Sequence, residues 1–243
     1  MNRRHLDPCH NLQNPMSGWL SAFMSAKGAV PNAEVSNEQF KPTTRPVGLF
    51  LGGTSGIGQA MAEQLAKQTN GKAQIIILGR NQETAEKIIA SFPHTPEGTP
   101  PDQASKYSFI KVDATSMAQI REVTSRLSKE LDKVNFIVTS CGLLSFNGRD
   151  NTNEGIDRQF ACYFYARFRF IRDLIPLVVK AEGEGERVGV MSVLGPNRGG
   201  PVDLDDMGLA KNFSLRRMIG HGTSYTDASF EVGFHSYPYH KRF

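Results

Sequence analysis

The strongest constraint on the fold is a glycine-rich turn, residues 52–58 (GGTSGIG), which joins an apolar run at 47–51 to a helical pattern at 59–69. Glycines let the backbone turn sharply and lie close to a pyrophosphate, because a Cβ atom would block that approach. The helix after the turn directs free N–H groups and its positive dipole end at the phosphates. The alternative is a simple turn between two core elements. The pattern favours a strand–turn–helix unit that binds a nucleotide through Gly52, Thr54, Ser55, Gly56, Ile57 and Gly58.

The glycine spacing resembles the Thr-Gly-x-x-x-Gly-x-Gly motif of the short-chain dehydrogenases/reductases (SDR family). Leu51 stands where that motif has its threonine, and the resemblance covers roughly residues 45–230. It implies an α/β fold with a doubly wound parallel sheet, Rossmann-like, that binds NAD(H) or NADP(H). The family continues beyond the point where this chain stops, so we expect a sheet that lacks the last strands.

Composition and charge exclude several other classes. The 243 residues are enough for one α/β domain, and 39% hydrophobic and 21% charged residues are typical of a folded chain. The net charge of +4 suits a phosphate-bearing ligand but does not by itself indicate nucleic acid. No apolar stretch approaches the roughly 18 residues of a membrane helix, so we expect no membrane partner. Three scattered cysteines favour a reducing compartment, the cytoplasm, and no metal site.

The chain divides into three parts. Prolines punctuate residues 1–44, and we interpret them as a flexible N-terminal extension rather than a transit peptide, despite Arg3 and Arg4. Residues 45–232 form the predicted NAD(P)-binding Rossmann-like domain. Residues 233–243 resemble neither a strand nor the family's substrate segment, and we expect an irregular tail.

The end of the second strand bears on the choice of cofactor. Residues 74–78 (QIIIL) are almost wholly apolar, as in a parallel strand buried on both faces, and Gly79 and Arg80 come directly after them. An acid at this place would bind the ribose 2′-OH of NAD, whereas a guanidinium can fork onto a 2′-phosphate. Arg80 therefore favours NADP(H), unless it is only an exposed arginine at a helix start.

Two further strand ends carry candidate cofactor residues. A third strand at 107–112 ends in Asp113, which matches the aspartate that contacts the adenine amino group in the resembled family. Asp113 or Thr115 could instead, or also, cap the next helix. A fourth strand at 134–139 leads to Gly142, which matches a family glycine that lets the backbone approach the cofactor, although the usual asparagines are missing.

A long helix is expected over residues 154–180, where apolar side chains recur at helical spacing. Its arginines (Arg158, Arg167, Arg169 and Arg172) alternate with aromatics, a pattern also found on nucleic-acid surfaces. A partly buried helix with its charged face in water accounts for the pattern better, so we expect no nucleic-acid partner. In the resembled family this helix often packs against its twin in a homodimer.

The resemblance also implies a catalytic set. A fifth strand at 187–192 ends in Ser192, which matches the serine that hydrogen-bonds the substrate oxygen. Counting from residues 201–209 places the family tyrosine near Ile219 and its lysine near Thr223, where neither residue type stands. Tyr225 is the nearest tyrosine and our candidate proton donor. Tyr163 occupies the place of the relay asparagine.

Two functional hypotheses remain open at the level of the sequence. The first is an NADP-dependent oxidoreductase that transfers a hydride between NADP(H) and a carbonyl or secondary alcohol of a small hydrophobic metabolite, as in specialised-metabolism reductases. The second is a truncated, non-catalytic protein that binds NADP(H) at most and acts through partners. The cofactor half and Ser192 favour the first hypothesis, and the missing lysine and asparagine favour the second.

Overall fold

The computed structural model describes residues 35, 39–195 and 197–236. The chain separates into two units, residues 1–41 and 42–243, and the second unit contains the whole of the described sheet. The predicted extension at 1–44 lies almost wholly outside the described residues. Of the helices that the structure describes, none has the length and apolar character needed to cross a membrane.

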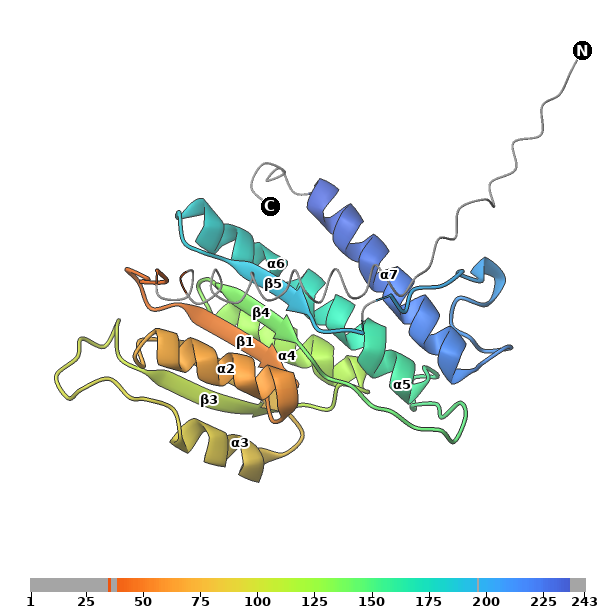
Figure 1. Ribbon diagram of the computed structural model, residues 1–243, viewed down its shortest axis with the longest axis horizontal. Helices are drawn as coiled ribbons and strands as arrows, with labels where there is room; N and C mark the ends of the chain where they lie inside the picture. Colours follow the sequence, from red (N-terminus) through yellow and green to blue (C-terminus); the bar gives the residue numbers. More distant parts are fainter. Residues whose placement is uncertain (1–34, 36–38, 196, 237–243) are drawn as a thin grey trace, which may run out of the picture. The chain divides into compact units, whose positions relative to one another are not determined.

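Five parallel strands form one sheet in the order β3-β2-β1-β4-β5 (Figure 1). The strands are β1 (Val47–Leu51), β2 (Gln74–Gly79), β3 (Lys106–Lys111), β4 (Phe136–Thr139) and β5 (Gly189–Ser192). The strand order reverses between β1 and β4, and ligands of such sheets bind at the carboxyl ends of the strands at this point. The predicted doubly wound parallel sheet is confirmed, and β5 lies at its edge in the described part of the chain.

Helices cover both faces of the sheet. They are α2 (Gly56–Gln68), α3 (Gln82–Ala90), α4 (Met117–Glu130), α5 (Arg158–Phe160), α6 (Ala166–Gly183) and α7 (Leu215–Ser236), with a π-helix η1 (Ala161–Tyr165) and a 3-10 helix η2 (Leu204–Asp206). The helices α2 and α3 pack on one face, and α4 and α6 pack on the other. The helix α7 packs against α5 and η1.

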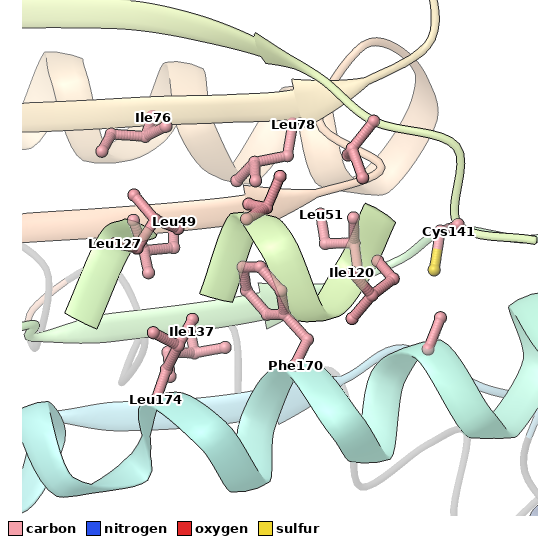
Figure 2. Packing of buried hydrophobic residues seen from close by; sticks show 14 of the residues in the cluster. Leu49, Leu51, Ile76, Leu78, Ile120, Leu127, Ile137, Cys141, Phe170 and Leu174 are labelled. Carbon is pink, nitrogen blue, oxygen red and sulfur yellow. The ribbon is translucent and has the colours of Figure 1, made fainter. Parts of the chain in front are cut away.

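The alternation of side chains along each strand builds two cores. In β1, Leu49 and Leu51 point towards α4 and α6, whereas Phe50 points towards α2 and α3. Figure 2 shows the first core, to which Phe170 of α6 and Ile137 of β4 both belong. Both side chains are fully buried, so this cluster anchors the long helix to the strand that precedes it.

The long helix differs from its prediction in its start, in its continuity and in the burial of one arginine. It begins at Arg158, later than expected, and the π-helix η1 interrupts it between α5 and α6. The expectation that its arginines face water is wrong for Arg167, of which only 4% is exposed. Six positions of α6 are buried, and Arg167 is one of them.

The end of the domain also shifts. The helix α7 runs to Ser236, past the predicted boundary at 232, so the first residues of the expected irregular tail are helical. Residues 237–243 lie outside the described part of the chain.

Replacing Phe170 with alanine tests the core that holds the long helix. We expect Phe170→Ala to lower the free energy of unfolding by about 3–5 kcal/mol, because it leaves a cavity among fully buried side chains. Urea denaturation followed by circular dichroism measures the change. Phe146→Ala is the control, since Phe146 is 81% exposed and its loss should change stability by less than about 0.5 kcal/mol. Equal effects of the two substitutions would contradict this packing.

Candidate active site

The glycine turn after β1 lies against the backbone that continues from β4. A Cβ atom on Gly52 would lie 2.5 Å from the backbone nitrogen of Cys141, and one on Gly58 would lie 2.2 Å from Oγ of Ser140. Gly52 also has a φ of 93°, in the left-handed region that favours glycine. Ser140 secures the approach, because its hydroxyl donates to the Gly52 carbonyl at 3.2 Å. The structure thus gives a steric reason for glycine at both positions.

The N-terminus of α2 has the features of a phosphate site. Within the described part of the chain, no acceptor is present for the backbone amides of Gly56, Ile57 and Gly58. The N-cap residue Ser55 makes no side-chain capping hydrogen bond, and Ile57 is 59% exposed. Thr54, within the turn, lies against the end of β2. A Cβ atom on Gly79, the last residue of that strand, would lie 3.1 Å from the Thr54 methyl group. Open amides at a helix N-terminus beside a glycine turn fit the phosphates of a dinucleotide.

The other predicted cofactor residues lie just beyond strands of the same sheet edge. Arg80 comes directly after β2, is exposed, and forms no ion pair with any described residue. Asp113 lies after β3 and Gly142 after β4, where a Cβ on Gly142 would meet open space. Burial raises the pKa of Cys162 to about 12, and the charges of Asp113 and Arg80 have smaller, opposite effects on it.

The N-terminus of α4 resolves one of the alternatives for Asp113. The cap of this helix is Ser116, whose side chain accepts from the amide of Gln119 at 3.3 Å. Glu154 accepts from the first two amides of α4, each at 2.8 Å. The interpretation of Asp113 or Thr115 as the cap is therefore wrong. The Asp113 carboxylate accepts from the Thr115 amide at 2.9 Å and forms a local turn.

Ser192 stands at the carboxyl end of β5 and is held by Arg167, one of the arginines expected to face water. The Ser192 Oγ accepts a hydrogen bond of 3.1 Å from the Nη1 atom of Arg167. The guanidinium also donates hydrogen bonds to backbone carbonyl oxygens, those of Thr139, Cys141, Cys162 and Val193. The sequence did contain a signal for this role, because position 167 falls on the apolar stripe, three residues after Phe164 and four before Ile171.

The structure does not bring Tyr225 into contact with Ser192. The Tyr225 ring lies in an aromatic cluster with Phe160 and Phe164, at centroid distances of 5.8 Å and 5.2 Å. Its hydroxyl donates to the Met207 carbonyl at 3.0 Å and lies 3.4 Å from Nδ1 of His221. Burial raises the pKa of Tyr225, so the hydroxyl is protonated at neutral pH.

Thr223, the α7 position that counting from residues 201–209 assigns to the family lysine, lies against the long helix. The Tyr163 hydroxyl lies 3.4 Å from Oγ1 of Thr223, so the places that the resemblance assigns to the relay asparagine and the lysine are adjacent in space. The Tyr163 ring also covers the Arg167 guanidinium, with 5.8 Å between the Cζ atom and the ring centroid. Tyr163 thus borders the group that holds Ser192.

The close approach at Gly58 can be tested without any ligand. We expect Gly58→Ala to lower the free energy of unfolding by about 1–3 kcal/mol, since the added methyl group would overlap Ser140 and the Gly52 carbonyl. Gly183→Ala is a matched control in α6, where the added Cβ meets nothing within 4 Å. Thermal unfolding of both variants decides the point, and an unchanged midpoint for Gly58→Ala would contradict the close approach.

Comparison with known proteins identifies the family. The short chain dehydrogenase family model matches residues 47–202. The oxidoreductase AN1596 of Emericella nidulans is 30% identical over 204 residues, which cover 84% of this chain and 58% of that protein. The chain therefore spans little more than half of this curated relative's length.

Solved structures show the same fold. A metagenomic short-chain oxidoreductase in complex with NADP superposes with a TM-score of 0.55 at 16% identity, covering 79% of this chain and 77% of that one. An NADH-dependent reductase, A1-R′, complexed with NAD, superposes with a TM-score of 0.54 at 15% identity, covering 83% and 75%. The sheet order, the glycine turn and the match over most of the domain lead to one conclusion: this chain belongs to the short-chain dehydrogenase family.

Proposed function

We propose that this chain is an NADP-dependent oxidoreductase that transfers a hydride between NADP(H) and a carbonyl or secondary alcohol of a small hydrophobic metabolite. One observation carries the proposal: the open amides of α2 and the Ser192 hydroxyl lie at the carboxyl edge of one parallel sheet. When bound, the nicotinamide supplies the hydride for the carbonyl carbon, and the carbonyl oxygen then needs a hydrogen-bond donor and a proton.

The preference for NADP(H) rests on Arg80. Its exposed guanidinium lies just after β2, where the adenosine ribose lies in this fold, and it has no carboxylate partner among the described residues. A free guanidinium suits a 2′-phosphate and offers nothing specific to a 2′-hydroxyl. The structural relatives do not decide between the cofactors, since one is complexed with NADP and another with NAD.

A hydrophobic substrate is supported by the surroundings of Ser192. An apolar cavity of about 490 Å³ adjoins this residue between α6, α7 and β5. Its lining includes Phe164, Phe168, Ile171 and Val190. We propose a carbonyl compound with a hydrocarbon body, from a specialised metabolism such as that of fungi, and a cytoplasmic site of action.

For the proton, we propose Tyr225 with support from His221. The Nε2 atom of His221 accepts from the Asp203 amide at 3.3 Å, so in the neutral imidazole Nδ1 carries the hydrogen and donates to the Tyr225 oxygen. This contact stabilises negative charge on the phenolic oxygen, although less than a cationic side chain would. In the proposed reaction the Tyr225 hydroxyl exchanges the Met207 carbonyl for the substrate oxygen.

A non-catalytic, NADP-binding or interaction protein is the second candidate. The separation of Tyr225 from Ser192 and the absence of a lysine at Thr223 favour it. The apolar residues of α6 that line the cavity would then serve assembly, including a homodimer through the long helix. Measured turnover of a carbonyl probe with NADPH separates the two candidates.

Replacing Arg80 tests the choice of cofactor. We expect Arg80→Glu to weaken NADPH binding by about tenfold or more, because a carboxylate would repel the 2′-phosphate, and to change NADH binding by less than about threefold. Dissociation constants from calorimetry give the ratio. Arg121→Glu makes the same charge change on an exposed residue of α4 and should leave the ratio unaltered. If Arg80→Glu leaves the ratio of NADPH to NADH affinity unaltered, the assignment of Arg80 to the 2′-phosphate is wrong.

Replacing Tyr225 tests the proton donor. We expect Tyr225→Phe to reduce kcat by about 10²-fold or more, because the developing alkoxide loses its acid. Tyr107→Phe is a matched control, since its hydroxyl also donates to backbone carbonyls, those of Gly71 and Pro93, but lies in β3. If Tyr225→Phe retains turnover at the level of Tyr107→Phe, Tyr225 serves only packing.

A further inference from the structure

Arg167 differs from the other arginines of α6 in what surrounds it. Arg169 and Arg172 share the carboxylate of Asp173, at 2.5 Å and 2.9 Å, and their side chains remain 33% and 53% exposed. Arg167 is buried, and its described partners include no carboxylate. Burying a cation costs several kcal/mol unless hydrogen bonds replace its lost hydration. The burial of this cation on the apolar stripe of the helix therefore needs an explanation other than contact with water.

The direction of one hydrogen bond provides that reason. A guanidinium can only donate, so the Ser192 Oγ must be the acceptor in its 3.1 Å contact with Nη1. This contact leaves the Ser192 hydroxyl hydrogen free to donate, and no described residue accepts it. Arg167 and Ser192 also line the same cavity, so the unused hydrogen has space beside it for a guest oxygen.

We infer that Arg167 is a positioning residue that holds the Ser192 hydroxyl as a donor to the substrate carbonyl oxygen. The inference rests on the proposed oxidoreductase function and adds a member to its site. The guanidinium fixes the Ser192 oxygen at the carboxyl end of β5 and polarises its O–H bond. Its positive charge also acts in a weakly screened interior, where it makes the Ser192 hydroxyl a stronger donor to the substrate oxygen as the hydride arrives.

A purely structural role of Arg167 would differ from a positioning role in how its loss combines with the loss of Ser192. The same guanidinium donates to the Thr139 carbonyl at 3.4 Å and to the Val193 carbonyl at 2.6 Å, and so joins the ends of β4 and β5. If that joining were all, removal of Arg167 would lower stability and reduce activity independently of Ser192. A positioning role makes the two losses of activity non-additive, since Arg167 acts only through Ser192.

The experiment is a double-mutant cycle on the full chain with NADPH and 9,10-phenanthrenequinone as the carbonyl probe. The variants are Arg167→Met, Ser192→Ala and the pair together, with Arg167→Lys to retain charge and Arg169→Met as the control on the same helix. We expect each single change to lower kcat by about 10²-fold, the pair to lower it no further, and KM to change less than about threefold. We expect Arg167→Lys to recover part of the loss and Arg169→Met to match the wild type. NADPH affinity, measured separately, should stay within about threefold throughout.

Each outcome decides the matter. Wild-type chain that binds NADPH but does not reduce the probe removes the proposed function, and the inference falls with it. Wild-type turnover with multiplicative losses in the pair leaves the oxidoreductase intact and overturns the role of Arg167. If Arg167→Met does not fold, the same cycle with Arg167→Lys replaces it, and additivity there overturns the inference equally.

Discussion

The approach of the glycine turn to the end of β4 is the contact on which the site depends. Gly52 lies against the backbone of Cys141, and Ser140 hydrogen-bonds the Gly52 carbonyl. The carbonyl oxygen of Cys141 in turn accepts a hydrogen bond from the Arg167 guanidinium, which also donates to Ser192. The proposed phosphate site at α2 and the candidate substrate serine at β5 are thus joined through the end of the strand that lies between them.

The positive charges at the carboxyl edge of the sheet explain how it can provide both the proposed phosphate site and the proposed carbonyl site. The α2 terminus and Arg80 place positive potential beside the carboxyl ends of β1 and β2, which suits the phosphates of a dinucleotide. Arg167 supplies a second, buried positive charge close to the proposed carbonyl site. Its neighbours are carbonyl oxygens rather than carboxylates, so its charge is not neutralised by an ion pair within the described chain. Through the Ser192 hydroxyl that it holds, this charge favours a developing alkoxide in the proposed reaction.

The region around α7 is where this chain departs most from the pattern it resembles. Tyr225 is packed among aromatic rings, and its hydroxyl is engaged by Met207 and His221. Tyr163 and Thr223 meet at the places of the relay asparagine and the lysine, but neither can carry the positive charge that a lysine brings. In the proposed reaction, proton transfer therefore has to work through hydroxyls and an imidazole.

Local patterns in the sequence are enough to predict the fold class, the strand ends and the glycine turn. These patterns are apolar runs of strand length, a glycine cluster spaced as in a dinucleotide-binding turn, and helical spacing of small side chains. The hydrogen-bond partners of Arg167, the contact of Glu154 with the first amides of α4 and the separation of Tyr225 from Ser192 emerge only from tertiary packing. Each of these depends on the relative positions of residues that lie far apart in the sequence. The helical period that marks an apolar stripe cannot show what covers that stripe once β4, β5 and α7 have packed around it.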